Sequence, residues 1–206
     1  MNKEEIKKLI NKENPIIFEI GCADGRDTKE FIEVFKNLKI YCFEPEPKNI
    51  EIVKSTINYK NHFLFEGVIS DQTGVINFNR SRTDNPNDLS YSGSIKKPKE
   101  HLNEWPFIKF DDIIEVQSIK LDDFCEKNKI DFIDFIWADV QGAEEAMIIG
   151  GLKTLNEKVK FLYTEYSNKE YYEEQIALDK ILQLLGDRWS IVEDFGTDVL
   201  LKNISL

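Results

Sequence analysis

The chain has little positive charge, little cysteine and no long apolar run. Of its 206 residues, 27 are lysine or arginine and 38 are aspartate or glutamate, which gives a formal net charge of −11. Proteins that grip nucleic-acid phosphates normally present a basic face, so this balance argues against a nucleic-acid partner. No apolar run approaches the length of a bilayer span, and the polar start lacks the apolar core of a signal peptide. We therefore expect a cytoplasmic protein without a membrane span.

Cysteine is limited to three residues, Cys22, Cys42 and Cys125. Their spacing is unlike that of metal ligands, and each lies in or beside a segment that we predict to be a strand or a helix. These features are typical of reduced thiols in the core of a cytosolic protein.

A length of 206 residues suits one domain, 1–206, with a sizeable core. Residues 1–13 contain a short amphipathic helix that we expect to cap the domain. Three predicted strands, at 15–20, 39–43 and 62–66, then alternate with helices at 26–37 and 47–57. With right-handed crossovers, this alternation predicts half of a doubly wound parallel sheet.

The second half of the chain begins with a change in character. Residues 68–78 are expected to form a hairpin that turns between Asp71 and Gly74. Residues 79–111 are polar and rich in turn formers, and a connection of this length predicts a lid over a binding site. Its lysines at 96, 97 and 99 are expected to be a solvated charge run.

The remaining predicted elements return to strands and helices. We expect strands at 114–119, 130–138 and 161–165, a helix at 171–185, and a final antiparallel pair at 189–192 and 199–202. Acids follow or end three of the predicted strands, namely Glu44, Asp139 and Glu165. Ligands of open α/β sheets bind outside the carboxyl ends of the strands, so these acids should border one crevice.

The first glycine-containing turn predicts a nucleotide-type binding site. An apolar run, 16–20, breaks at Gly21 and Gly25 before a helical pattern begins. Glycine tolerates positive φ and close approach of a ligand, and the next helix directs its free N–H groups toward the turn. Ala23 and Arg26 stand where a dinucleotide fingerprint requires glycine, which disfavours an NAD-dependent oxidoreductase.

Two acids accompany this turn. Glu19 lies inside the first strand, where an unpaired buried carboxylate is costly, so we expect it to face a cationic or hydrogen-bonding ligand. Glu44 ends the second strand before Pro45, close to the position at which nucleotide-binding folds place an acid that accepts hydrogen bonds from ribose hydroxyls.

Motifs along nearly the whole chain resemble those of one family. The pattern Glu19-x-Gly21-x-x-x-Gly25 resembles the first motif of class I S-adenosylmethionine-dependent methyltransferases. The full set of motifs is similar to that of the FkbM-type branch: Phe43-Glu44-Pro45, Ile69-Ser70-Asp71, Ser92-Gly93-Ser94, Leu121-Asp122-Asp123, Asp139-Val140-Gln141-Gly142-Ala143-Glu144 and Thr164-Glu165.

This resemblance implies an α/β fold, a doubly wound Rossmann-like seven-stranded and mostly parallel sheet with an antiparallel C-terminal hairpin. It also implies O-methylation of a hydroxyl group on a sugar, a polyketide or another small natural product, with S-adenosylmethionine as methyl donor. The residues expected to bind this cofactor are Glu19, Gly21, Cys22, Ala23, Asp24, Gly25, Glu44, Pro45, Ser70, Asp71, Asp139 and Gln141.

The candidate catalytic residues are Asp139, Glu165 and His101, with Asp139 as the favoured general base. Asp139 could instead bind the ammonium group of the cofactor, Glu165 could bind the acceptor or be structural, and His101 could be a surface-loop residue. Some O-methyltransferases use Mg²⁺, but the chain has no distinctive ligand set, and no metal is predicted.

Two other functional classes remain open at this stage. The chain could be a non-catalytic Rossmann-like binding protein that keeps the turn as scaffold, or, with less support, a nucleotide-dependent oxidoreductase. Fold alone cannot choose between these classes, because function belongs to sites.

Overall fold

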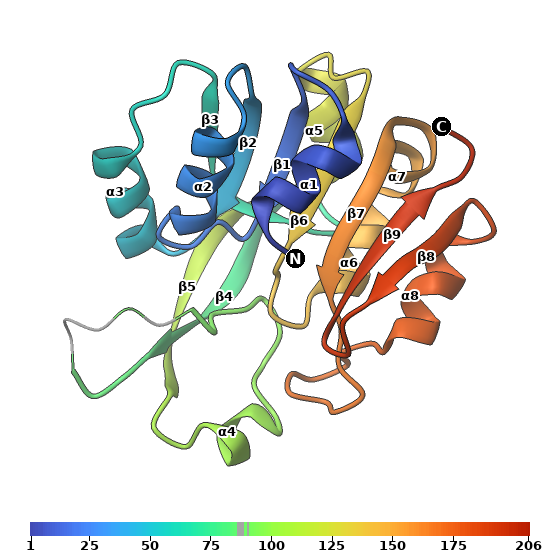
Figure 1. Ribbon diagram of the computed structural model, residues 1–206. Helices are drawn as coiled ribbons and strands as arrows, with labels where there is room; N and C mark the ends of the chain where they lie inside the picture. Colours follow the sequence, from blue (N-terminus) through green and yellow to red (C-terminus); the bar gives the residue numbers. More distant parts are fainter. Residues whose placement is uncertain (86–88, 90) are drawn as a thin grey trace.

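The computed structural model describes residues 1–85, 89 and 91–206, which form one mixed sheet with helices on both faces (Figure 1). The strands that the structure describes are nine in number and run in the order β4-β5-β3-β2-β1-β6-β7-β9-β8. Their bounds are β1 Ile16–Ile20, β2 Lys39–Glu44, β3 His62–Ile69, β4 Gly74–Arg82, β5 Lys109–Ile119, β6 Ile133–Ala138, β7 Val159–Glu165, β8 Trp189–Asp194 and β9 Asp198–Asn203.

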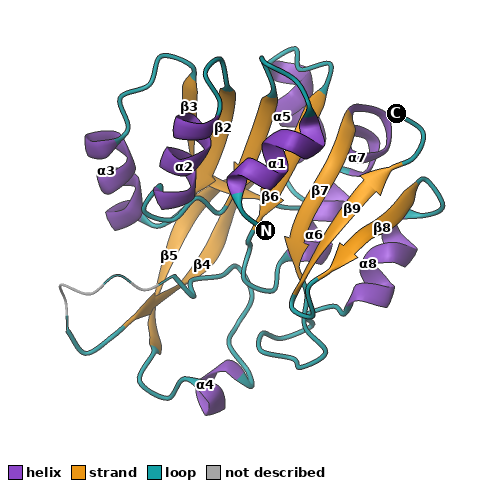
Figure 2. Ribbon diagram, in the orientation of Figure 1, coloured by secondary structure: helices purple, strands orange, loops and turns teal. Residues whose placement is uncertain are grey.

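The helices form two layers around the sheet, as Figure 2 shows. One face carries α1 Lys3–Ile10, α2 Arg26–Val34 and α3 Pro47–Thr56. The other carries α5 Leu121–Lys127, α6 Glu144–Gly150, α7 Leu152–Lys158 and α8 Leu178–Leu185, and a short α4, His101–Glu104, lies apart from both layers. Among the described residues, no helix combines the length and apolarity needed to cross a membrane.

The central strands are largely apolar because both of their faces are buried. In β1, Ile17 packs with the layer of α1 and α2, whereas Phe18 and Ile20 pack with the layer of α5 to α8. Successive side chains of a strand point to opposite faces, so a strand between two helical layers needs apolar residues on both faces, and a polar exception such as Glu19 needs a protein partner. The predicted doubly wound α/β architecture is confirmed.

Seven of the nine described strands, from β3 to β8 in the sheet order, form the predicted sheet with its reversed C-terminal pair. Strands β1, β2, β3, β6 and β7 pair in parallel, and β9 pairs antiparallel with both β7 and β8. The sheet is larger than expected, because β5 extends it beside β3 and β4 pairs with β5.

The predicted hairpin over 68–78 is wrong. Although β3 and β4 follow each other in the chain, β5 lies between them, parallel to β3 and antiparallel to β4. Strands are present on both sides of the predicted turn, but their pairing depends on β5, which is distant in sequence. The helix expected over 171–185 is also shorter, because α8 begins at Leu178.

The region expected to be a lid, 79–111, is framed by strands at both ends, since β4 continues to Arg82 and β5 begins at Lys109. Residues 86–88 and 90 of this region lie outside the described part of the chain. Its described remainder joins the segment 166–177: the amides of Lys99 and His101 both donate to the carbonyl of Tyr171.

Side chains also join this region to the segment 166–177. Lys96 pairs with Glu174 at 3.1 Å, and Lys99 pairs with Glu170. These two lysines are therefore ion-pair partners and not the purely solvated charges that their sequence suggested.

Gly21 joins the carboxyl ends of two neighbouring strands. It follows β1 with φ of 87°, and a Cβ atom placed on it would lie 1.9 Å from the backbone oxygen of Asp139, directly after β6. Gly21 also donates its amide hydrogen to the carbonyl of Phe43, at 2.9 Å. The glycine is thus required by contact between backbone segments, in addition to any contact with a ligand.

We predict that Gly21→Ala destabilises the fold by more than the left-handed backbone alone would explain. A non-glycine residue in that conformation costs about 1–2 kcal/mol, and the clash with Asp139 adds to it. Gly196→Ala is the matched control, because Gly196 has φ of 88° and open space around its Cβ position. Urea denaturation should show a clearly larger loss of unfolding free energy for Gly21→Ala; equal losses would contradict the proposed clash.

Candidate active site

The carboxyl ends of the parallel strands border an open cavity of about 710 Å³. Its walls are the turn after β1, the ends of β2 and β3, part of β4, the turn after β6, and residues 91–95, which we call the strap. The lining residues are Ile20, Gly21, Ala23, Phe43, Glu44, Pro45, Glu46, Asn49, Gly67, Val68, Ile69, Phe78, Ser81, Tyr91, Gly93, Ser94, Ile95, Asp139, Val140, Gln141 and Ala143.

Glu44 is the buried acid at one end of this cavity. Its Oε2 accepts a hydrogen bond from the amide of Ala23 at 2.8 Å. Its Oε1 accepts from the amide of Glu46 at 3.0 Å and from the side chain of Asn49 at 3.2 Å. Burial raises the pKa of Glu44 to about 7. These three bonds hold the carboxylate at the cavity wall and leave roughly one of its four acceptor positions for a ligand.

Glu19 does not reach the cavity, contrary to our expectation. Its side chain points to the other face of the sheet, where Thr28 of α2 donates a hydrogen bond to its Oε2 at 2.5 Å. The thiol of Cys42 donates to the same oxygen at 3.6 Å. Period-two alternation places Glu19 on the side opposite to Ile20, which does line the cavity. Its partner is therefore a protein side chain and not a ligand.

The rest of the turn after β1 is divided between the cavity and the core. Gly21 and Ala23 line the cavity, whereas Cys22 is buried in the core with α1 and α2. Gly25, with φ of 76°, lies against α3, since a Cβ atom there would be 2.7 Å from Ile57.

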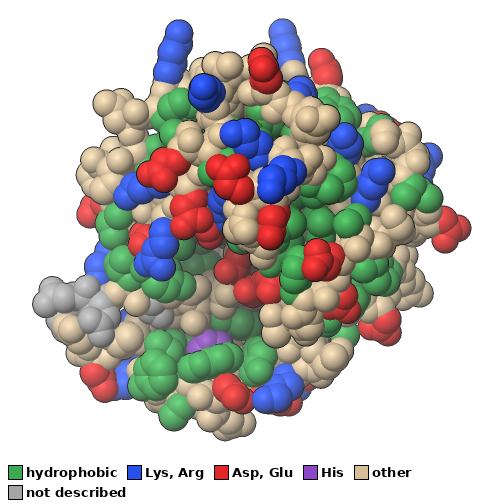
Figure 3. Space-filling model, viewed as in Figure 1, with side chains coloured by type: hydrophobic (Ala, Val, Ile, Leu, Met, Phe, Trp, Pro, Cys, Tyr) green, Lys and Arg blue, Asp and Glu red, His purple; other side chains and the backbone are tan. Residues whose placement is uncertain are grey.

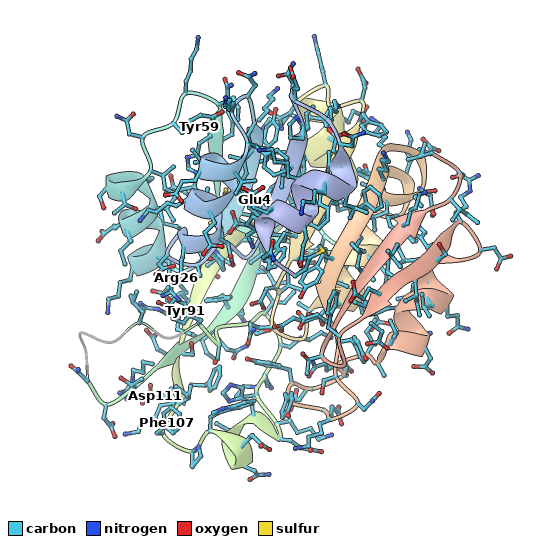
Figure 4. The ribbon with its side chains drawn as sticks, viewed as in Figure 1. Glu4, Arg26, Tyr59, Tyr91, Phe107 and Asp111 are labelled. Carbon is cyan, nitrogen blue, oxygen red and sulfur yellow. The ribbon has the colours of Figure 1, made fainter. Side chains whose placement is uncertain are left out.

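Asp24 connects this turn with the strap. It accepts a hydrogen bond from the hydroxyl of Tyr91 at 3.3 Å and is paired with Arg26 at 3.4 Å. Figure 4 shows Tyr91 next to Arg26, below α2. Because Ser94 of the strap also donates to the backbone carbonyl of Gln141, the strap spans the cavity from the turn after β6 to the turn after β1.

Ser70 and Asp71, both expected at the cofactor, lie outside the cavity lining. The hydroxyl of Ser70 bonds to that of Ser118 at 2.7 Å, and Asp71 is exposed. The residues just before them, Val68 and Ile69, line the cavity instead. The cavity thus meets this strand two residues before the predicted pair.

Asp139 and Glu165 meet at the ends of β6 and β7. The two carboxyl groups interact with each other. Burial raises the pKa of both groups, and the negative charge of Asp139 further raises that of Glu165. Two neighbouring acids in one water-poor site favour a state in which they do not both carry a charge.

The turn after β6 holds Asp139 from its other side. The side-chain amide of Gln141 donates to Oδ1 of Asp139 at 2.7 Å, and the hydroxyl of Tyr172 lies 2.9 Å from the Gln141 side-chain oxygen. Ser94 of the strap donates to the backbone carbonyl of Gln141 at 2.7 Å. The strap and the segment 166–177 therefore both fix this turn.

Glu144, the first residue of α6, is a further buried acid near Asp139. Its Oε1 accepts the amide hydrogen of Gly142 at 3.3 Å, and its Oε2 has no partner. Burial raises the pKa of Glu144 to about 7, and Asp139 adds to this effect. In the part of the chain that the structure describes, no group of three or more acids, histidines or cysteines has an arrangement that could hold a metal ion.

His101 is buried, which excludes the alternative of a surface-loop residue. Its ring lies 4.7 Å from that of Trp105 and 5.5 Å from that of Tyr172, and its Nδ1 has no hydrogen-bond partner. Burial lowers the pKa of His101, so the imidazole is neutral near pH 7. Because it is not among the cavity-lining residues, His101 is not brought together with Asp139.

Figure 3 shows a recess on this side of the molecule, with acidic side chains along its upper edge and hydrophobic and histidine side chains below it, over α4. A cavity that joins apolar walls to acids of raised pKa is typical of an enzyme site. Comparison with known proteins shows which enzymes resemble this chain.

Residues 19–196 match the methyltransferase FkbM domain. The chain is also 40% identical over 208 residues to the 2-O-methyltransferase NoeI of Sinorhizobium fredii, covering 98% of this chain and 85% of that protein. This chain belongs to the FkbM methyltransferase family.

A solved structure supports the fold assignment. An rRNA methylase from Streptococcus thermophilus aligns with a TM-score of 0.52 at 12% identity, over 98% of this chain and 93% of the other. At that identity the likeness concerns the fold only. Membership of the FkbM family makes the chain a methyltransferase and sets aside the oxidoreductase and non-catalytic readings.

Several residues around the FkbM site were not identified from the sequence. Tyr172 and Asn49 hold two predicted site residues, Gln141 and Glu44, in position. Phe78 contributes an apolar wall from β4. Tyr172 lies in a polar stretch without a motif, and no pattern in the sequence points to it.

We predict that Glu19 makes the fold less stable as the pH rises. Burial raises its pKa from 4.5 to about 8, so between these values the folded chain holds a proton that the unfolded chain has lost. The free energy of unfolding should therefore fall with rising pH, by on the order of 1 kcal/mol per pH unit from this group. In Glu19→Gln this contribution is absent, and the variant should gain stability relative to wild type from pH 5 to pH 8.

Urea denaturation at several pH values measures this difference. Glu30→Gln, at an exposed position of α2, is the control and should follow wild type. Parallel curves for Glu19→Gln and wild type would contradict the assigned titration.

Proposed function

We propose that this FkbM methyltransferase transfers a methyl group from S-adenosylmethionine to a hydroxyl group of a sugar or another small natural product, such as a polyketide-like acceptor. The observation that carries this proposal is one cavity lined by two separate acids, the buried Glu44 at the end of β2 and the half-buried Asp139 after β6. The first suits a ribose, and the second suits the reacting hydroxyl. The name of the relative, a 2-O-methyltransferase, supports an oxygen acceptor.

The residues of the cavity fit the proposed cofactor. Glu44 retains an acceptor position on Oε2, directed at the cavity, for a ribose hydroxyl. Val68, Ile69 and Phe78 offer the apolar contacts that an adenine ring requires. The backbone of Gly21 and Ala23 lies between the two acids, where the amino-acid part would be placed.

S-adenosylmethionine, when bound, supplies an electrophilic methyl group on a positively charged sulfur atom. The protein has to align an acceptor oxygen with that group, and such positioning contributes about 7–11 kcal/mol to the lowering of a barrier. The carboxylate of Asp139, which lines the cavity, would give the site a negative potential that suits this positive charge.

Asp139 is the residue that we propose to remove the proton of the acceptor hydroxyl. It lines the cavity, and it is held by Gln141 on one side and by Glu165 on the other. Its raised pKa makes it a stronger base than an exposed aspartate, and general-base catalysis typically contributes 10²–10⁴-fold. Glu165 would act through Asp139, because the two groups are neighbours and the charge of Asp139 raises the pKa of Glu165.

The remaining expectations concern the surroundings of the site. The strap closes over the cavity through Tyr91 and Ser94, which supports the proposal that the region 79–111 serves as a lid. His101 is proposed to support Tyr172 by ring packing, because its ring lies 5.5 Å from the ring of Tyr172 and Tyr172 in turn contacts Gln141. The cytoplasmic location and the absence of a nucleic-acid partner stay predictions from the sequence.

The first test is calorimetric titration with S-adenosylmethionine, S-adenosylhomocysteine and NAD(H). We expect micromolar binding of the first two and none of the third. An acceptor screen would then use methyl glycosides with a free 2-hydroxyl, together with their 2-deoxy counterparts, and radiolabelled cofactor. Absence of cofactor binding would refute the proposal.

We predict that Glu44→Gln weakens S-adenosylmethionine binding by more than tenfold, because a hydrogen bond to a charged acceptor contributes about 1.5–3 kcal/mol. Wild-type affinity should also fall as the pH drops below about 7, where Glu44 becomes protonated and accepts less well. Calorimetry from pH 6 to pH 8.5 measures both effects. Glu66→Gln, a change of a half-exposed acid on β3, should bind like wild type; an unchanged affinity in Glu44→Gln would remove Glu44 from the ribose site.

We predict that Asp139→Asn binds S-adenosylmethionine within a few-fold of wild type but loses at least a hundredfold in kcat, since the amide cannot accept the proton. Calorimetry and initial rates with an acceptor from the screen measure the two properties. If the variant instead loses cofactor affinity while its kcat is retained, Asp139 is a ligand of the cofactor's ammonium group and not the base.

A further inference from the structure

We propose that Tyr172 is a positioning residue, whose hydroxyl fixes the side-chain amide of Gln141 with its N–H directed at Asp139. The inference rests on the proposed function, in which Asp139 is the general base. It concerns a residue outside all of the motifs that identify the family, on the segment between β7 and α8. Removal of the hydroxyl should make the Asp139 carboxylate harder to form.

The contacts form a chain from the surface segment to the base. The Tyr172 hydroxyl lies 2.9 Å from the Gln141 side-chain oxygen, and the Gln141 side-chain nitrogen lies 2.7 Å from Oδ1 of Asp139. The hydroxyl also lies 2.8 Å from the carbonyl oxygen of Ser92 in the strap, so its single proton is shared between these two acceptor oxygens. Burial and the nearby carboxylates raise the pKa of Tyr172 above its ordinary value, so it remains a donor throughout the working pH range.

The backbone of the turn is shaped to receive this ring. Gln141 and Gly142 have φ of 51° and 85°, both in the left-handed region. A Cβ atom on Gly142 would lie 2.8 Å from the Tyr172 side chain, so only glycine lets the ring lie against the turn. Left-handed backbone at Gln141 is unfavourable for a non-glycine residue, and the Ser94 and Tyr172 hydrogen bonds offset this.

The orientation of an amide decides what it offers to its neighbour. With its oxygen held by the Tyr172 hydroxyl, Gln141 presents N–H to Asp139, which stabilises the carboxylate. Without the hydroxyl, the amide can turn its oxygen to Asp139, where it would accept the proton of the neutral acid. The tyrosine therefore favours the form of Asp139 that can act as a base.

Other charged groups face Asp139 and must be considered in any titration. They are Glu165 at the end of β7, Glu144 at the start of α6 and Asp198 on β9. The charge of Asp198 raises the pKa of Asp139, and the charge of Asp139 raises the pKa of Glu144 and of Glu165. None of them is altered in Tyr172→Phe, and the ring, which carries the packing, is retained. A change in the titration of Asp139 would thus report on the hydroxyl.

The test is a titration of Asp139 by NMR in protein labelled with [4-13C]aspartate. The resonance is assigned by its loss in Asp139→Asn, and no acceptor is needed. In Tyr172→Phe we expect its midpoint at a higher pH than in wild type. The control is Tyr171→Phe, which removes the same oxygen atom from the neighbouring residue and should leave the midpoint unchanged. An unchanged or lower midpoint in Tyr172→Phe would overturn the inference.

A double variant tests the route through Gln141. Gln141→Asn tolerates the left-handed backbone, but its amide is too short to join Asp139 and Tyr172. In the Gln141→Asn background, Tyr172→Phe should cause no further shift of the Asp139 midpoint. If it causes the same shift as in wild type, the hydroxyl acts by another route and the proposed relay is wrong.

Kinetics separate this inference from the proposed function. With an acceptor from the screen, Tyr172→Phe should lower kcat at pH 7 about tenfold, which is the effect of one lost hydrogen bond, and leave cofactor affinity unchanged. Full activity of Asp139→Asn would refute the role of Asp139 as base, whatever its midpoint does in Tyr172→Phe. An inactive Asp139→Asn together with an unshifted midpoint would refute the role of Tyr172 alone.

Discussion

The arrangement of the site depends on how the protein compensates its buried carboxyl groups for the loss of hydration. A buried carboxylate is unfavourable unless hydrogen bonds or a proton compensate for the lost hydration. Glu44 obtains three hydrogen-bond donors, Asp139 obtains the amide of Gln141, and Glu165 has a raised pKa beside Asp139. Two of these contacts join segments that are distant in the chain: Ala23 connects the turn after β1 to Glu44, and Glu165 brings the end of β7 to Asp139.

The parallel sheet places these groups at one edge. Strands β2, β1, β6 and β7 are neighbours and run in the same direction, so the segments that follow them lie side by side. The backbone at Gly21 approaches that of Asp139 so closely that no side chain fits between them. This contact fixes the spacing between the part of the cavity near Glu44 and the part near Asp139, on which transfer between two bound molecules would depend.

The third contribution comes from two irregular segments that pack on each other. The strap and the segment 166–177 are joined by backbone hydrogen bonds and ion pairs, and each contacts the turn after β6. They carry Ser94 and Tyr172, which act on Gln141 and, through it, on Asp139. The strap and the turn that carries Asp139 are thus connected by a few hydrogen bonds.

The sequence by itself determined the layers and the edge at which the site lies. Period-two and period-3.6 apolar patterns report burial directly, and the acids at the ends of β2, β6 and β7 follow from the chain order. Tertiary structure alone decided that β5 separates β3 from β4, that Glu19 faces Thr28, and that Tyr172 reaches Gln141. Those outcomes depend on contacts between segments distant in the chain, and local patterns carry no information about which distant partner will satisfy a given strand edge or polar atom.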